Sequence, residues 1–223
     1  IGPIHKKINR KLTSFLLNKV NFITVRDYNS KKDLIEMGIK KENIVVTTDP
    51  VISMEKIDKN IGLEILKEEC PNFDSSIPTI GFAFRGRNYN PKFRKVLIDA
   101  IKELLDELNV NIVFIPFHYS EDIEINNDLE NLFKDKVIFI NKRYEVKEVL
   151  SIIENLDLLV GVRLHSLIFS AMANVPMIAI SYDPKIDYFM ETLGLKSLCS
   201  VEELTKEELV DSIKYMFCKQ KEF

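Results

Sequence analysis

Four apolar runs of the sequence end in side chains that can bind an anion or transfer a proton. The segments that follow them are RGRNY, HYSED, RLHS and YDPK. They supply, in chain order, Arg85 and Arg87, His118, Arg163 and His165, and Tyr182, Asp183 and Lys185. Arginine has a planar fork that fits a carboxylate or phosphate, and histidine suits general acid–base catalysis near neutral pH. These residue types predict a site that binds an anionic substrate and moves a proton.

The use of arginine at these positions supports anion binding. The chain has 24 lysines but only seven arginines, and Arg85, Arg87 and Arg163 are three of the seven. Lysine is a flexible point charge, whereas the guanidinium group is rigid and bidentate. Any one of these arginines could equally form a surface ion pair, and His165 alone could equally be a structural histidine. The coincidence of Arg163, His165 and Lys185 at neighbouring strand ends favours a functional site.

A parallel sheet would bring these strand ends to one edge. From residue 78 onward, short apolar runs alternate with helical patterns, at 79–84, 110–116, 136–140, 156–161 and 176–181, with 197–201 as an edge strand. Nearly continuous apolar strands between helices predict a doubly wound α/β domain with both faces of its sheet covered. Ligands of such sheets bind beyond the carboxyl ends of the strands, where helix N-termini point. The polar segments therefore mark one rim of the sheet.

The first 52 residues predict a smaller α/β unit. Helices are expected over 4–20 and from Ser30 to Met37, and short strands over 22–27 and 43–48. Ser30 could cap the second helix and Gly38 could end it. The first helix carries one apolar face, formed by Ile4, Ile8, Leu12, Phe15, Leu16 and Val20. Two strands and two helices bury little surface on their own, so we expect this unit to be the tail of a larger domain.

Composition and charge exclude several classes of protein. The formal net charge is −3, and positive and negative residues alternate without basic runs, so nucleic acid is not expected as a partner. No apolar run approaches the roughly 20 residues of a transmembrane helix, and no signal sequence opens the chain. We therefore expect a cytoplasmic protein whose contact with a membrane is peripheral.

Metal and cofactor motifs are not found in the sequence. Cys70, Cys199 and Cys218 show neither CxxC spacing nor a neighbouring histidine cluster, which predicts free thiols rather than a disulfide or a zinc site. The sequence has no carboxylate cluster with metal-ligand spacing, no P-loop, no GxGxxG and no GxSxG motif. No metal and no cofactor are therefore expected.

Two stretches of the sequence resemble the polysaccharide pyruvyl transferase family, in particular its bacterial cell-wall members. They are FITVRDYNSKKDLIEMGI followed by VVTTDPVI, and DLLVGVRLHSLIFSAMANVPMIAISYDPKIDYFM. The similarity runs in order along nearly the whole chain. The family is similar to two-domain glycosyltransferases of the GT-B type. The resemblance implies that residues 1–52 are the C-terminal part of an incomplete acceptor-side domain and that residues 78–223 form a Rossmann-like donor-binding domain. Residues 53–77 would be the connector between these two domains.

The resemblance also implies a reaction. Its donor is phosphoenolpyruvate, used as a co-substrate without a cofactor, and its product is a pyruvate ketal on a sugar diol, often of N-acetylmannosamine. The expected partners are phosphoenolpyruvate and a lipid-linked or polymeric glycan acceptor of the cell wall. The expected location is the cytoplasm, at the inner face of the membrane, with membrane contact made through the acceptor.

Individual residues map onto the motifs of the family. The motif arginine and histidine correspond to Arg163 and His165, the SYDPK lysine to Lys185, and the VRD arginine to Arg26. We expect His165 to be the general acid and base, with Arg163 and Lys185 as its catalytic partners. The residues expected to bind the donor are Arg163, Lys185, Arg26, Arg85, Arg87, Ser166 and Tyr182, with His118 and Asp183 as accessory groups.

Two other functions remain open. Nucleotide-sugar glycosyltransferases of the same fold often carry an E-A-M-A run whose glutamate holds sugar hydroxyls, and here Ser170 stands at that position. A serine there argues against such a contact, although Glu154 or Asp157 could substitute for the glutamate. A noncatalytic module that binds anions or sugars is the other alternative, and such a module would bind phosphoenolpyruvate without turning it over.

Overall fold

The computed structural model describes residues 4–86 and 90–220, without the side chains of residues 41, 135 and 218–220. Arg87, a predicted donor-binding residue, lies outside this described part. The chain divides into two compact units, Ile1–Met54 and Glu55–Phe223. The assignment of the first to an acceptor-side domain stays a prediction.

The first unit is a parallel pair of short strands with two α-helices. Its elements, in chain order, are α1 (Lys7–Leu17), β1 (Ile23–Val25), α2 (Tyr28–Glu36), the 3-10 helix η1 (Lys41–Asn43), β2 (Ile44–Val46) and the 3-10 helix η2 (Pro50–Ser53). A small core of Leu34, Ile39 and Ile44 joins α2 to the strands. The apolar face predicted for α1 is not buried in this unit, since Ile8 is 80% exposed and Leu12 56%.

The cap of α2 differs from the prediction. Asp27, not Ser30, is the N-cap: its carboxylate accepts hydrogen bonds from the Ser30 backbone N–H at 2.6 Å and from the Ser30 hydroxyl at 2.9 Å. A carboxylate is the stronger acceptor, and the positive end of the helix dipole favours its charge. The predicted end of the helix is confirmed, because Gly38 has a φ of +87°, in the left-handed region that favours glycine.

The second unit is built on six parallel strands in the order β5-β4-β3-β6-β7-β8. The strands are β3 (Thr79–Ala83), β4 (Asn111–Phe114), β5 (Ile138–Phe139), β6 (Leu158–Gly161), β7 (Met177–Ser181) and β8 (Cys199–Ser200). The helices are α3 (Lys59–Glu69), α4 (Pro91–Glu107), α5 (Tyr119–Phe133), the 3-10 helix η4 (Lys134–Lys136), α6 (Val146–Ile153), α7 (Leu164–Ala173), α8 (Pro184–Thr192) and α9 (Lys206–Gln220). The predicted doubly wound α/β domain is confirmed.

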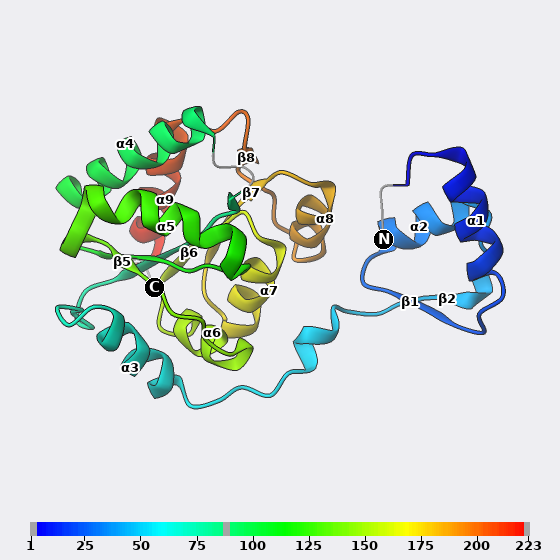
Figure 1. Cartoon of the computed structure of the whole chain (residues 1–223), viewed down its shortest axis with the longest axis horizontal. Coiled ribbons are helices and arrows are strands. Elements are labelled where there is room, and N and C mark those ends of the chain that lie inside the picture. Colours follow the sequence, from blue (N-terminus) through cyan, green and yellow to red (C-terminus); the bar gives the residue numbers. More distant parts are fainter. Residues whose placement is uncertain (1–3, 87–89, 221–223) are drawn as a thin grey trace. The chain divides into compact units, whose positions relative to one another are not determined.

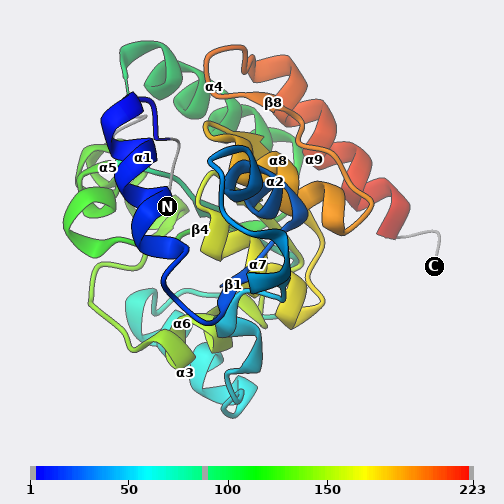
Figure 2. The same cartoon turned by 90° about the vertical axis from the view of Figure 1, so that its right-hand side faces the viewer.

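Helices cover both faces of this sheet. Figure 1 shows α4, α5 and α9 on one side and α3, α6 and α7 on the other, and Figure 2 shows α9 alongside α4. The chain runs outward from β3 through β4 to β5, then returns to the other side of β3 and continues from β6 to β8. This reversal between β3 and β6 is the switch point at which doubly wound proteins bind their ligands.

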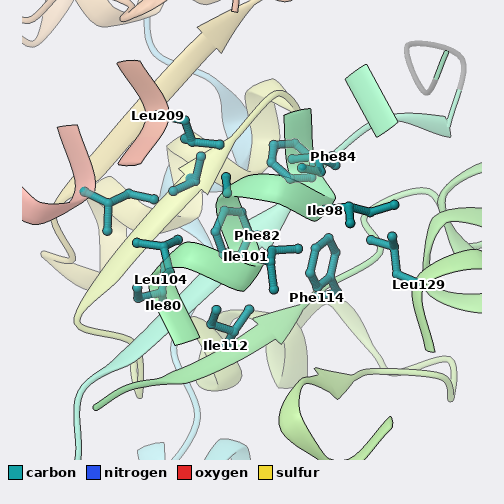
Figure 3. Close-up of a cluster of buried hydrophobic side chains, with 14 of the residues drawn as sticks. Ile80, Phe82, Phe84, Ile98, Ile101, Leu104, Ile112, Phe114, Leu129 and Leu209 are labelled. Carbon is teal, nitrogen blue, oxygen red and sulfur yellow. The ribbon is translucent and has the colours of Figure 1, made fainter. Parts of the chain in front are cut away.

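The largest part of the core lies between the sheet and α4, α5 and α9. Ile80 and Phe82 of β3 point to this side because alternate strand residues share a face. Figure 3 shows them with Phe84, which follows β3, and with side chains of β4 and of the three helices, namely Ile98, Ile101, Leu104, Ile112, Phe114, Leu129 and Leu209. The phenyl rings of Phe82 and Phe114 stack at 5.3 Å between centroids. Such a core fixes the strand ends that carry the polar residues.

A close helix crossing on the opposite side gives the first testable prediction. Gly62 of α3 packs against the backbone of α6, where an added Cβ would lie 2.1 Å from the Ser151 carbonyl oxygen. Its N–H donates to the Ser151 hydroxyl at 2.8 Å. Alanine normally stabilises a helix relative to glycine by about 0.5–1 kcal/mol. Gly62→Ala should instead lower the free energy of unfolding by about 1–3 kcal/mol, because the crossing would be over-packed.

Denaturant titration followed by circular dichroism measures this change. Glu64→Ala, at an exposed position of the same helix, is the control and should stay within about 0.5 kcal/mol of the wild type. A Gly62→Ala variant as stable as the control would show that the crossing can relax.

Candidate functional site

The polar strand ends of the second unit gather at the carboxyl edge of the sheet. Arg85 follows β3, Arg163 follows β6, and Tyr182 follows β7. These three strands are direct neighbours in the sheet, with β3 paired to β6 and β6 paired to β7. The predicted rim therefore lies at the switch point. Because α7 and α8 begin there, their N-termini also direct positive dipole ends to it.

Arg85, Tyr182 and Lys185 form a cluster, called the cation cluster below. The Arg85 guanidinium carbon lies 4.6 Å from the centroid of the Tyr182 ring, and the Lys185 ammonium nitrogen lies 5.3 Å from it. A ring between two cations partly offsets their mutual repulsion through its negative face. Lys185 also pairs with Asp183 at 3.4 Å, at a position where both side chains are about one-third exposed. The cluster therefore holds two cations, with the partly solvated carboxylate of Asp183 beside it.

The Arg85 side chain has a donor without an acceptor. Its Nε is buried and has no hydrogen-bond partner among residues 4–86 and 90–220. An unsatisfied buried donor costs roughly 1–3 kcal/mol, and more for a charged group. The Arg85 guanidinium group thus has hydrogen-bonding capacity that the described residues do not use.

Arg163 is engaged by carboxylates that the sequence analysis did not single out. Its Nε and Nη2 form a fork on Asp122, at 3.1 Å and 2.5 Å, and Nη2 also lies 3.2 Å from Glu121. Asp122 is 2% exposed. Both acids occupy the first turn of α5, next to His118 in the HYSED segment. The available signal was the pair of acidic residues three and four positions after the strand-end His118, because the first turn of a helix suits carboxylates.

Gly86 stands at a close approach of two backbone segments. It is not among the glycines with positive φ, so the conformation of its own backbone does not require glycine. An added Cβ would instead lie 2.0 Å from the carbonyl oxygen of Glu121. The Gly86 N–H donates to Asp122 at 3.1 Å. Glycine therefore lets the loop after β3 approach the start of α5.

The first turn of α7 carries His165 and Ser166. His165 is exposed, next to Arg163 at the N-cap position. Ser166 is fully buried, and its hydroxyl donates to the Arg163 carbonyl oxygen at 2.6 Å. The Ser166 hydroxyl thus supports the turn that presents His165, and its predicted role in donor binding stays a prediction.

The other predicted residues are distributed around this site and in the first unit. His118 is exposed at the N-cap position of α5, with its ring Nδ1 3.3 Å from the Ser120 hydroxyl. Asp183 caps α8 by accepting from the Lys185 N–H at 3.1 Å. Arg26 belongs to the first unit, where it pairs with Asp49 at 3.3 Å and with Asp27 at 3.8 Å.

The residues considered for a nucleotide-sugar contact do not reach the rim. Ser170 is fully buried, and its hydroxyl donates to the Val175 carbonyl oxygen at 2.8 Å. Glu154 ends α6 and pairs with Lys56 at 2.7 Å. Asp157 accepts from the Thr79 N–H at 2.7 Å. Glu154 and Asp157 precede β6 and so lie at the amino edge of the sheet, opposite the rim. The suggestion that one of them takes the place of the glutamate that holds sugar hydroxyls is therefore wrong.

The side chains that most often bind metals are not clustered in the described part of the chain. This part contains no group of three or more histidine, cysteine, aspartate or glutamate side chains placed to hold a metal ion. Cys70 and Cys199 are free thiols. Burial, with smaller contributions from Glu208 and Glu203, raises the pKa of Cys199 to about 11, so the Cys199 thiol is protonated at neutral pH. In these same ranges no helix is long and apolar enough to cross a bilayer.

Comparisons with solved structures identify the fold. S. aureus MnaA with UDP matches with a TM-score of 0.68 and 15% identity, covering 94% of this chain and 55% of its own. The Neisseria meningitidis UDP-GlcNAc 2-epimerase with UDP-GlcNAc matches at 0.63 and 15%, covering 93% and 55%. Anabaena Alr3699/HepE with UDP and glucose matches at 0.58 and 14%, covering 96% and 58%. The predicted GT-B-like α/β fold is confirmed.

Sequence comparisons identify the family. Amylovoran biosynthesis protein AmsJ of Erwinia amylovora is 21% identical over an alignment 219 residues long, which covers 90% of this chain and 52% of AmsJ. The chain thus spans about half the length of this relative. Residues 1–184 match the sequence profile of polysaccharide pyruvyl transferases. Because this match extends over more than half of the chain, the protein belongs to the polysaccharide pyruvyl transferase family.

Proposed function

We propose that this protein transfers a pyruvyl group from phosphoenolpyruvate to two hydroxyls of a sugar in a polysaccharide precursor, forming a ketal and releasing phosphate. Membership of the pyruvyl transferase family supports the class of reaction. The observation that carries the choice of donor is the cation cluster at the switch point. Its members, Arg85 and Lys185, present two positive charges around Tyr182.

The donor carries a phosphate and a carboxylate, and the rim offers groups for both. An arginine fork fits either group, whereas a lysine supplies a point charge. Arg85 has an unused buried donor among the described residues, and Lys185 lies at the first turn of α8. The N-terminus of α7 adds the backbone N–H groups and dipole of a second helix, and no acidic residue lies in its first turn. These features support binding of a small dianion or trianion.

His165 is the proton donor and acceptor of the proposed reaction. It would protonate the methylene carbon of phosphoenolpyruvate, which leaves an oxocarbenium-like centre at the carbon that bears the phosphate. A sugar hydroxyl attacks that carbon and loses its proton to the histidine. The carbon–oxygen bond to phosphate then breaks, and the second hydroxyl closes the ketal as its proton passes to the departing phosphate. One molecule of donor and one diol thus give one ketal and one phosphate.

The acceptor belongs to the same proposal. We expect a lipid-linked or polymeric cell-wall glycan, with an N-acetylmannosamine residue as the pyruvylated sugar. Such an acceptor would bring the protein from the cytoplasm to the inner face of the membrane. No cofactor enters the proposed reaction, because phosphoenolpyruvate supplies the transferred group and the leaving group.

Calorimetric titration of this chain with phosphoenolpyruvate tests the proposed donor. We expect saturable binding that inorganic phosphate weakens only at higher concentration and that UDP does not displace. Preferential binding of UDP would instead favour a nucleotide-sugar enzyme of the same fold, for which Ser170 provides no hydroxyl contact. Binding of phosphoenolpyruvate without phosphate release in the presence of a range of glycan acceptors would favour a noncatalytic module.

A further inference from the structure

We propose that Asp122 is a positioning residue of the donor site, and that Arg163 acts through Asp122 rather than as the main clamp for the donor anion. This inference rests on the proposed function and deepens it, because it assigns different roles to the arginines at the rim. Arg85, in the cation cluster, then provides the guanidinium group that binds the donor.

Asp122 connects three loops at the switch point. Its carboxylate accepts hydrogen bonds from the backbone N–H groups of Gly86 at 3.1 Å, Phe117 at 3.2 Å and His118 at 2.8 Å. It also accepts both bonds of the Arg163 fork. These donors come from the loops after β3, β4 and β6. A carboxylate buried to 2% exposure with five N–H contacts holds these loops in one arrangement.

The charges around Arg163 make it a poor primary anion site. Glu121 and Asp122 both contact its guanidinium group, so the three side chains together carry a formal charge of −1. Its Nε and one of its terminal nitrogens are already bonded to carboxylate oxygens. Arg163 is 15% exposed, while Lys185 in the cation cluster is 35% exposed. The attraction for a donor anion therefore comes mainly from the cation cluster.

Hydrogen bonds link Asp122 to the backbone segments that carry His165 and Arg85. The Arg163 carbonyl oxygen accepts from the N–H of Ser166 at 3.0 Å and from its hydroxyl, which fixes the first turn of α7 and thus the position of His165. On the other side, the bond to the Gly86 N–H fixes the residue that follows Arg85. Asp122 is thereby connected to the proposed acid–base residue and to the proposed anion-binding arginine.

Asp122→Asn separates positioning from simple electrostatics by the sign of its effect. Loss of a negative charge beside an anion site should strengthen binding if the charge alone matters. An amide also replaces one acceptor oxygen with a donor, which cannot accept the N–H bonds. We therefore expect phosphoenolpyruvate to bind about tenfold more weakly, measured by calorimetry. Unchanged or tighter binding would overturn the inference.

Two further variants test the inference if Asp122→Asn fails to fold and show whether the effect is specific to Asp122. Asp122→Glu keeps the charge but moves the carboxylate by one methylene, so it should also weaken binding, and wild-type affinity for this variant would count against positioning even if Asp122→Asn failed to fold. Asp128→Asn is the matched control. Asp128 lies further along α5 and makes a similar fork, with Arg94 at 2.6 Å and 3.2 Å, and its change should leave binding within about twofold of the wild type.

A readout without the donor separates this inference from the proposed function. Amide hydrogen exchange followed by NMR should show faster exchange at Gly86, Phe117, His118 and Ser166 in Asp122→Asn than in Asp128→Asn. If the wild-type chain fails to bind phosphoenolpyruvate, the proposed donor is wrong, and the exchange rates alone decide whether Asp122 organises the three loops. Equal exchange in both variants would contradict the positioning role.

Discussion

Replacing His165 with glutamine should lower the rate of pyruvyl transfer by about 100-fold or more, while the affinity for phosphoenolpyruvate changes little. General acid–base catalysis by a positioned side chain typically contributes 10²–10⁴-fold to a rate, and glutamine keeps hydrogen-bonding capacity without a titratable proton. His165 is exposed on the first turn of α7, beside Arg163 and one strand away from Tyr182. We expect it to face a substrate bound at the rim, because α7 begins at the carboxyl end of β6.

The measurement is phosphate release from phosphoenolpyruvate in the presence of a glycan diol, with donor affinity determined separately by calorimetry. His5→Gln is the control, because His5 is exposed and is not among the predicted site residues. We expect wild-type rates for this control. A His165→Gln variant that kept more than about one-tenth of the wild-type rate would remove the acid–base role. A variant that lost donor affinity instead would make His165 a binding residue.

The fold was predictable because it depends on local patterns. Apolar runs of six or seven residues between amphipathic segments predicted β3, β4, β6 and β7, and the SLCSV segment predicted the edge strand β8. The strands are shorter than the runs, most clearly for β5, which covers Ile138–Phe139 of the predicted 136–140. Strand ends depend on pairing with neighbours, and pairing is a long-range property that composition does not encode.

The site was predictable only in part, for the same physical reason. Strand-end rules placed Arg85, Tyr182 and Lys185 on one rim, and the structure brings these three together. They could not predict that Arg163 binds Asp122. The two residues are 41 positions apart, and they meet across the end of β3, which lies between β4 and β6. They also could not explain Gly86, whose requirement arises from the backbone of Glu121 and not from its own turn. Contacts between two loops depend on which strands are neighbours in the sheet, and the sequence pattern does not give that order.

Replacing Arg85 with glutamine should weaken phosphoenolpyruvate binding by about 10- to 100-fold, the largest effect on donor affinity expected from a single residue at the rim. Hydrogen bonds to charged groups contribute roughly 1.5–3 kcal/mol each, which corresponds to this range. Arg85→Lys should also weaken binding, because lysine keeps the charge but loses the planar fork that stacks on Tyr182. Calorimetry with phosphoenolpyruvate measures both variants.

Stability should respond differently from binding at this position. The Arg85 Nε is buried without an acceptor among the described residues, so its removal relieves a cost that offsets the loss of the cation–π contact with Tyr182. We therefore expect the free energy of unfolding of Arg85→Gln to stay within about 1 kcal/mol of the wild type. Functional sites often contain residues that are needed for binding but do not stabilise the fold, and Arg85 would be such a residue.

Arg94→Gln provides the matched control for this prediction. Arg94 lies in the first turns of α4, close in sequence to Arg85, but its fork binds Asp128 at a position where both side chains are more than one-third exposed. Its removal should leave donor affinity unchanged within about twofold, since an exposed ion pair contributes little. If Arg94→Gln weakened binding as much as Arg85→Gln, the effect would reflect the general positive charge of this surface. If Arg85→Gln bound the donor like the wild type, the donor would have to bind through Arg163 and Lys185, and the division of roles between the two arginines would be wrong.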